Sequence, residues 1–223
     1  MKTNTLDIRH MDCMALMAEF PDNHFDLAVV DPPYGIDAAN DSRGGQKHGK
    51  AAATSKSYGK KDWDKCTPNE AYFAELERVS KNRIIWGANH MMDKIKLSSP
   101  SWIVWDKQNG DNGYADCELA WTSHKTAVRK ITFRWAGMLQ GDMKNKEIRI
   151  HATQKPVKLY DWIFANYAEK GMKILDSHLG SGSSAIASHY AGMHMTACEL
   201  DEDYYKAACE RIHRETSQTT FEL

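Results

Sequence analysis

The chain has 223 residues, of which 42% are hydrophobic and 26% charged, and this composition argues against a wholly disordered protein. No apolar run approaches the ~20 residues needed to span a bilayer, and the amino-terminal residues lack the apolar core of a signal peptide. The five cysteines, an odd number without a CxxC pair, favour a reducing cytoplasm over a disulfide framework. We therefore expect a single cytoplasmic domain over residues 1–223, with no membrane contact.

The net charge of −1 hides two basic segments. Residues 41–61 hold six lysines and arginines and one acid, a local charge of +5, and residues 125–149 hold seven and two, again +5. Residues 199–215 are acidic, with six acids and three bases. Two basic segments in a near-neutral chain can form one positive face, although each segment alone is more typical of a solvated surface.

The predicted elements begin with a strand over 6–9, a short helix over 13–20 and a buried strand over 25–30. Residues 36–62 are rich in Gly, Ser, Ala and Lys without periodicity, which predicts a long mobile loop. Thr67-Pro68-Asn69-Glu70 has the spacing of a capping box and predicts a helix from there to about residue 80. Further strands are expected over 83–86, 102–105, 118–122 and 128–133, and a helix is expected to open at Pro156.

The last third of the chain predicts a βαβ unit. A strand over 172–175 reaches Asp176, a glycine-rich turn leads into a helix of small residues, and a strand over 194–198 ends at Glu199. Asp201 then opens a terminal helix. A βαβ unit requires a parallel sheet with a right-handed crossover. The expected fold class is therefore α/β, a Rossmann-like, doubly wound and mostly parallel sheet.

A ligand site is expected in this unit, because Gly180-Ser181-Gly182-Ser183-Ser184-Ala185 matches G-x-G-x-x-G/A. The glycines let the backbone approach a ligand, and Glu199 can accept both hydroxyl protons of a ribose. Asp176 would repel a pyrophosphate but would bind an ammonium. S-adenosylmethionine has an ammonium and a ribose and no phosphate, so the two acids favour it. A packing turn with N-cap acids and an NAD-dependent oxidoreductase are the alternatives.

The order of the elements indicates a circular permutation. Only 24 residues follow Glu199, which is too few to complete an open α/β sheet. The remaining strands must therefore come from upstream, and the cofactor-binding half, residues 151–223, lies at the carboxyl end.

The candidate catalytic motif is Asp31-Pro32-Pro33-Tyr34, directly after an apolar strand, where parallel α/β sheets bind their ligands. The prolines stiffen the backbone and remove two donors. The Asp31 carboxylate and the Pro32 carbonyl can accept both protons of a planar exocyclic amine and so favour its nucleophilic form. Tyr34 can stack on an extruded base. A proline-rich strand exit with Tyr34 in the core is the structural alternative.

With this motif, the chain resembles the amino-methyltransferases of DNA, in the permuted group in which Asp-Pro-Pro-Tyr precedes the cofactor motif. His151-Ala152-Thr153-Gln154-Lys155-Pro156 resembles that family's His-Pro-Thr-x-Lys-Pro. Asp176-Ser177-His178-Leu179-Gly180-Ser181-Gly182 resembles its Asp-Pro-Phe-x-Gly-Ser-Gly, and residues 85–89 and 102–107 are also similar to this group. Ala152, Ser177 and His178 depart from the usual residues.

The resemblance implies transfer of a methyl group from S-adenosylmethionine to the N6 of a flipped adenine in double-stranded DNA. Cytosine N4 is the alternative, but the related cytosine enzymes usually carry Ser where this chain has Asp31. The implied catalytic residues are Asp31, Pro32, Pro33 and Tyr34. The implied cofactor-binding residues, with Asp12 at the adenine amine of the cofactor, are Asp12, Cys13, Asp31, Lys155, Asp176, Ser177, His178, Gly180, Ser181, Gly182, Ser183, Glu199 and Leu200.

Other methyltransferase classes fit the sequence less well. Ribosomal RNA guanine and protein-glutamine methyltransferases share a similar Pro-Pro-Tyr but carry the cofactor motif first. A DNA cytosine-C5 enzyme needs a nucleophilic Pro-Cys, and no cysteine here follows a proline. The resemblance also allows for a homodimer and a partner restriction endonuclease.

The DNA-contacting residues are expected in two places. The family carries its target-recognition segment between the Pro-Pro-Tyr and His-x-Thr-x-Lys-Pro motifs, here about residues 125–150, and the 36–62 loop adds further lysines. The expected DNA-binding residues are Arg43, Lys47, Lys56, Lys60, Lys61, Arg129, Lys130, Arg134, Lys144, Lys146 and Arg149. The histidines and cysteines lack ligand spacing, so no metal site is expected.

Overall fold

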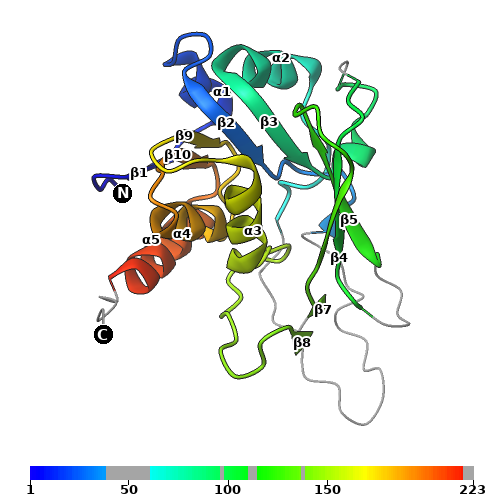
Figure 1. The fold of residues 1–223 in the computed structure, drawn as a ribbon. Coiled ribbons are helices and arrows are strands. Elements are labelled where there is room, and N and C mark those ends of the chain that lie inside the picture. The colour runs from blue at the N-terminus through cyan, green and yellow to red at the C-terminus, as the bar shows by residue number, and fades with distance from the viewer. Residues whose placement is uncertain (39–60, 96–97, 110–114, 137–138, 218–223) are drawn as a thin grey trace.

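An eight-stranded sheet forms the centre of the protein, seen in a computed structural model that describes residues 1–38, 61–95, 98–109, 115–136 and 139–217 (Figure 1). The strand order is β1-β10-β9-β2-β3-β5-β4-β6, and β5 is antiparallel to both of its neighbours while all other pairs are parallel. The strands are β1 (Leu6–His10), β2 (Phe25–Val30), β3 (Ser80–Trp86), β4 (Trp102–Asp106), β5 (Cys117–Thr122), β6 (Arg129–Thr132), β9 (Lys173–Asp176) and β10 (His194–Glu199). The predicted α/β, mostly parallel fold is confirmed.

Helices cover both faces of the sheet. The helices are α1 (Cys13–Ala18), α2 (Glu70–Val79), α3 (Val157–Tyr167), α4 (Ser183–Tyr190) and α5 (Glu202–Thr216), with a short 3-10 turn, η3 (Ala88–His90). Side chains alternate along β2, so Val29 packs with α3 and α4 while Ala28 and Val30 pack with α1 and α2. This two-sided burial explains why the strands are near-continuous apolar runs.

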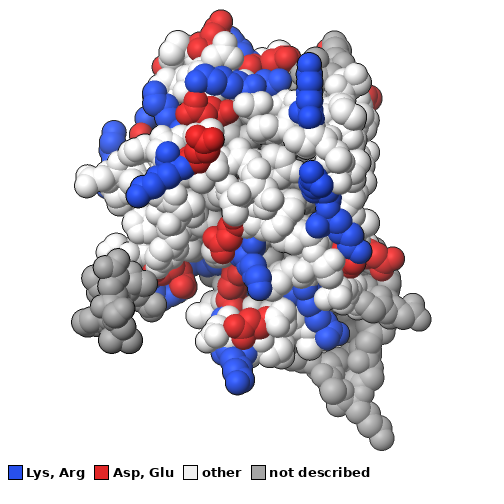
Figure 2. Space-filling view, viewed as in Figure 1, with Lys and Arg blue, Asp and Glu red and all other residues white. Residues whose placement is uncertain are grey.

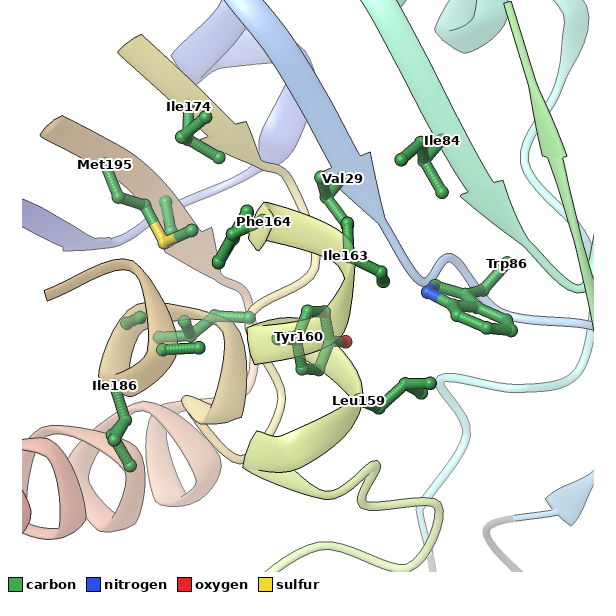
Figure 3. Packing of buried hydrophobic residues seen from close by; sticks show 14 of the residues in the cluster. Val29, Ile84, Trp86, Leu159, Tyr160, Ile163, Phe164, Ile174, Ile186 and Met195 are labelled. Carbon is green, nitrogen blue, oxygen red and sulfur yellow. The ribbon is translucent and has the colours of Figure 1, made fainter. Parts of the chain in front are cut away.

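The larger core lies between the sheet and helices α3 and α4 (Figure 3). Ile163 and Phe164 of α3 are almost completely buried against Val29 of β2 and the neighbouring strands. Trp86, at the end of β3, closes this core next to the motif that follows β2. The candidate catalytic motif, residues 31–34, therefore lies next to a closely packed core.

Most of the predicted elements are confirmed to within a few residues, with one clear error. Helix α2 begins at Glu70 with Asn69 as its N-cap, whose side chain accepts a hydrogen bond from the Tyr72 amide. The expected capping box from Thr67 is therefore wrong, because Asn69 is the stronger cap and takes that position. The hairpin of β7 (Trp135–Ala136) and β8 (Leu139–Gln140) was not predicted. Most of the predicted 36–62 loop, residues 39–60, lies outside the described residues.

The sheet topology brings the candidate motifs to one edge. Strands β2, β9 and β10 are parallel neighbours, so Asp31, Asp176 and Glu199 follow or end strands at the same carboxyl edge. Because β5 runs the opposite way, its amino end also lies there. In the described part of the chain, no helix has the length and apolar character needed to cross a membrane.

Candidate active site

A cavity opens at this carboxyl edge and collects most of the predicted site residues. All predicted cofactor-binding residues except Asp176 and Gly182 line it, together with Pro33 of the candidate catalytic motif. Residues not predicted from the sequence complete the wall; they are Met11, Trp63, His151, Thr153, Gln154, Tyr160, Leu179 and Tyr204. Motifs that are more than 140 residues apart in the chain, from Asp31 to Ser177, thus face a common space.

The Asp31 carboxylate is held firmly by its own motif and by Lys155. Its Oδ1 atom accepts a hydrogen bond of 2.7 Å from the Tyr34 hydroxyl and lies 2.5 Å from the Lys155 ammonium. Lys155 also donates to the Tyr34 hydroxyl at 3.0 Å. Lys155, which was expected to bind the cofactor, lines the cavity, and its ammonium contacts the candidate catalytic motif.

A second carboxylate, Glu118 at the start of β5, shares the same ammonium. Glu118 Oε2 lies 3.1 Å from Lys155 Nζ, and Oε1 accepts from Lys107 at 3.0 Å. Burial raises the pKa of Glu118, but the two ammonium groups outweigh burial and lower it to about 2. Burial also raises the pKa of Asp31, and Lys155 opposes that rise. The result is a row of alternating charges, Lys107, Glu118, Lys155 and Asp31.

Glycine is required beneath the Tyr34 ring. Gly87, the N-cap of η3, has φ of +64°, and a Cβ there would lie 2.0 Å from the ring. His90, on the same turn, stacks on Tyr34 with a centroid separation of 5.1 Å and an interplanar angle of 14°. Gly87 and His90 thus hold the Tyr34 ring by close packing and by stacking.

In the glycine turn after β9, both the backbone conformation and the close packing require glycine at position 182. Gly182 has φ of +76°, and a Cβ at this position would meet the Ile212 side chain at 2.9 Å. Gly180 also has positive φ, with more space around it. Gly182 thus allows α5 to pack on the turn, while Gly180 lies on the cavity wall.

Glu199 connects the glycine turn to α5. Its two carboxylate oxygens accept hydrogen bonds of 2.9 Å from the backbone amides of Gly180 and Asp201. Each carboxylate oxygen has a second lone pair, so these bonds leave capacity for the ribose hydroxyls expected here.

Asp176 is buried behind the cavity wall rather than on it. Its oxygens accept from the Ser184 hydroxyl at 2.5 Å and from the His178 amide at 3.1 Å. Burial raises its pKa to about 7, although both hydrogen bonds act in the opposite direction. A nearby cation would relieve this cost.

Asp12, Ser177 and His178 line the cavity and also form local hydrogen bonds within the protein. Asp12 is the N-cap of α1, and its Oδ1 accepts from the Met14 and Ala15 amides. The Ser177 hydroxyl lies within hydrogen-bond distance of the Tyr72 hydroxyl, at 2.7 Å, and of His178 Nδ1, at 2.9 Å. Burial lowers the pKa of His178 to about 4, so its ring is neutral at pH 7. Ser177 and His178, two of the three residues that depart from the family pattern, thus form a hydrogen-bond network with Tyr72.

A buried ion pair joins the glycine turn to the segment before α3. The Arg211 guanidinium donates to the Ser181 carbonyl and to the Ser183 hydroxyl, and it lies 2.7 Å from Glu147 Oε2. Ser183 in turn donates to the Lys155 carbonyl at 2.7 Å. This ion pair was missed because Arg211 occurs in an ordinary charged helix.

Lys61 and Lys130, which were predicted to contact DNA, form ion pairs within the protein. The Lys61 ammonium lies 2.7 and 2.9 Å from carboxylate oxygens of Asp201 and Asp203, and Lys130 lies 2.8 Å from Asp106. Lys61 therefore differs from the expectation of a loop lysine that meets phosphate, because the acidic start of α5 attracts it.

The other DNA-contact candidates differ in exposure. Arg149 is half-buried and donates to the Ala152 carbonyl, whereas the exposed candidates are Arg129, Lys130, Arg134, Lys144 and Lys146. The hairpin of β7 and β8 lies beyond the edge where β2 and β3 end (Figure 1). On the face seen in Figure 2, basic and acidic side chains are interspersed. Arg43, Lys47, Lys56 and Lys60 lie outside the described residues.

The charged side chains that line the cavity are mainly acidic. Asp12, Asp31 and Glu199 line it, while Lys155 is paired and His151 is neutral at pH 7, because burial lowers its pKa to about 3. Within the described ranges, no three His, Cys, Asp or Glu side chains are grouped to hold a metal ion. Such a lining suits a cationic ligand better than a pyrophosphate.

Known proteins with similar sequences and folds include methyltransferases. A family model described as DNA methylase matches residues 25–210. The type II methyltransferase M2.MboI of Moraxella bovis is 24% identical over 244 residues, which covers 92% of this chain and 86% of that protein.

Two solved structures share the fold. The M1.HpyAVI complex with S-adenosylmethionine has a TM-score of 0.59 at 15% identity and covers 93% of this chain and 98% of its own. The cytosine-N4-specific PvuII DNA methyltransferase has a TM-score of 0.61 at 12% identity, with coverage of 96% and 92%.

Proposed function

Because the chain belongs to the N6/N4 family of DNA methylases, we propose that it transfers a methyl group from S-adenosylmethionine to the N6 of a flipped adenine in double-stranded DNA. The observation that carries this proposal is the Asp31 carboxylate, anchored through Oδ1 and lining the cavity that Glu199 and the glycine turn also line.

Asp31 and Pro32 supply what a poor amine nucleophile needs. The lone pair of an exocyclic amine is delocalised into the base, so acceptors for its protons favour the pyramidal form that develops in the transition state. Asp31 provides a fixed carboxylate for one proton, and the Pro32 carbonyl is the second acceptor. Tyr34 stacks on the base that has left the duplex.

The cavity fits S-adenosylmethionine by charge. Its acidic lining suits a ligand that carries a sulfonium and an ammonium, and the buried Asp176 carboxylate with its raised pKa gains from a nearby cation. Glu199 and Asp12 are the acceptors for the ribose hydroxyls and the adenine amine. When bound, this cofactor supplies an electrophilic methyl group. The same charges disfavour the NAD-dependent oxidoreductase, whose pyrophosphate would meet Asp12 and Glu199.

The identity of one residue, Asp31, favours adenine over cytosine as the target base. The related cytosine-N4 enzymes usually carry Ser where this chain has Asp31, although the PvuII enzyme, cytosine-N4-specific, has a similar fold. We also infer that the chain belongs to the permuted group, since Asp31 precedes the glycine turn. A homodimer, a partner endonuclease and a cytoplasmic location are parts of the same proposal.

The test is to identify the product. The protein is incubated with unmodified duplex DNA and S-adenosylmethionine labelled in its methyl group, and the DNA is digested to nucleosides for mass spectrometry. Labelled N6-methyldeoxyadenosine is expected. Labelled N4-methyldeoxycytidine would assign the alternative amine, and an unlabelled digest would refute the proposal. Calorimetry with S-adenosylmethionine and with NAD separates the two cofactor classes without any DNA.

A further inference from the structure

We propose that Glu118 is a positioning residue, which together with Lys107 holds the Lys155 ammonium at one oxygen of Asp31 and leaves the other oxygen for the substrate amine. This inference rests on the proposed function of Asp31. None of the sequence motifs includes Glu118, which is the second residue of the antiparallel strand β5.

The geometry of Lys155 shows why it needs support. Its side chain is only 4% exposed, and its ammonium lies 5.4 and 5.5 Å from the ring centroids of Tyr34 and Trp86. A lone ammonium in such surroundings is costly, so it must be matched by charge. Asp31 and Glu118 provide two carboxylates for it, and Lys107 balances the second one.

The contacts divide the two oxygens of Asp31. Oδ1 receives both the Lys155 ammonium and the Tyr34 hydroxyl. Within the described part of the chain, no hydrogen bond or ion pair reaches Oδ2. Because Oδ1 is anchored from two sides, the carboxylate is fixed before the substrate arrives, which is the condition for transition-state stabilisation by a preorganised group.

Glu118 also moderates the effect of Lys155 on Asp31. An ammonium paired with Asp31 alone would draw charge from that carboxylate and weaken it as an acceptor. Glu118 competes for the same ammonium at 3.1 Å and its own charge opposes that of Asp31. The charged and titratable groups that act on Asp31 are Lys155, Glu118, Tyr34, Tyr160 and Asp176. Changes at Glu118 and Lys155 should therefore move the titration of Asp31 in opposite directions.

The experiment compares Glu118→Gln, Lys155→Met and a control, Glu77→Gln. Glu77 pairs with the largely buried Arg83 at 3.6 Å, outside the cavity wall. Carbon-13 NMR follows the Asp31 carboxyl, identified by its loss in Asp31→Asn, as the pH is varied. We expect its titration midpoint to fall in Glu118→Gln, to rise in Lys155→Met and to stay in place in the control.

Kinetics provide the second measurement. In Glu118→Gln, kcat should fall by roughly 10- to 100-fold, as for a misplaced reacting group, while the KM values for DNA and cofactor stay near those of the wild type. An unchanged Asp31 midpoint in Glu118→Gln would overturn the inference, even if Lys155→Met does not fold. So would midpoints that move in the same direction in both variants.

Failure of the proposed function gives a different result. If the wild-type protein methylates neither adenine nor cytosine in DNA, the proposed function is refuted. The NMR titration still decides whether Glu118 controls Asp31, because it requires no turnover.

Discussion

The Asp64 carboxylate accepts hydrogen bonds from the backbone amides of Tyr34 and Gly35, at 2.7 and 2.9 Å. Its second oxygen accepts from the Ala38 amide at 2.8 Å, and the residue is only 2% exposed. Three amides that follow the two prolines thus converge on one side chain from 30 residues further along the chain. Asp64 replaces the sheet as the hydrogen-bond partner of the segment that carries Tyr34.

Replacement of Asp64 by Ala should therefore damage both stability and turnover. Three amides lose a charged acceptor, and we expect a loss on the order of 3 kcal/mol in the free energy of unfolding, since hydrogen bonds to charged groups contribute ~1.5–3 kcal/mol each and are not additive. Urea denaturation measures this loss. Asp62→Ala is the control, because its carboxylate is 78% exposed and pairs with Lys65 across one turn. Equal stability of the two variants would contradict the role of Asp64.

Replacement of Asp31 by Ala should abolish methyl transfer with little effect on cofactor binding. Loss of a preorganised polar group at the reacting centre costs on the order of 100- to 1,000-fold in rate. Labelled methyl transfer and calorimetry with S-adenosylmethionine check the two parts, and the affinity should stay within a few-fold. Turnover at the wild-type rate would remove Asp31 from the chemistry.

The sequence predicts the parts of the site that lie on regular parallel strands. Asp31, Asp176 and Glu199 each follow or end an apolar strand, and the βαβ unit and its neighbour β2 place them at one edge. Local pattern is sufficient there, because a parallel sheet assigns the carboxyl ends of its strands to a common side.

Contacts that depend on strand order and direction could not be predicted in this way. Glu118 reaches the site because β5 is inserted in antiparallel orientation between β3 and β4. The alternating pattern of a strand contains no information on its direction. Asp64 meets the Tyr34 amide across 30 residues, and Lys155 meets the Tyr34 hydroxyl across 121 residues. Both pairings depend on the paths of loops, which no short-range spacing specifies.

The raised pKa of Asp176 makes the stability of the free protein depend on pH. Below about pH 4 the carboxyl is protonated in the folded and unfolded states alike. Between about pH 4 and pH 7 the unfolded chain loses this proton while the folded protein keeps it, so the free energy of unfolding decreases as the pH rises. The change from 3.8 to about 7 corresponds to at most about 4 kcal/mol.

Asp176→Asn should remove this dependence. We expect the variant to be more stable than the wild type at pH 8 and to lose this advantage towards pH 4, as measured by urea denaturation at several pH values. Ser184→Ala removes a hydrogen bond that lowers the pKa of Asp176, so it should extend the decrease to higher pH. A constant difference between Asp176→Asn and the wild type from pH 4 to pH 8 would contradict the assignment.

Some lysines are expected to contact DNA, whereas others form ion pairs within the protein. If the exposed Lys144 and Lys146 neutralise phosphates, their joint replacement by Ala should flatten the slope of log affinity against log salt by about 0.9 for each phosphate that is no longer neutralised, for every duplex alike. Lys61→Ala should leave that slope unchanged, because its ammonium is already paired with Asp201 and Asp203.

Fluorescence titrations of labelled duplexes at several salt concentrations measure these slopes, with Lys206→Ala as the control. Lys206 is a surface lysine on α5 that pairs with Glu202, so its loss should not change the slope. If Arg129 or Arg134 reads a base edge, its replacement should instead change which sequence is methylated, by ~1–3 kcal/mol of discrimination. The opposite result would be a flatter slope in Lys61→Ala and an unchanged slope in the Lys144 and Lys146 variant. It would indicate that DNA binds near the start of α5 and not near the β7–β8 hairpin.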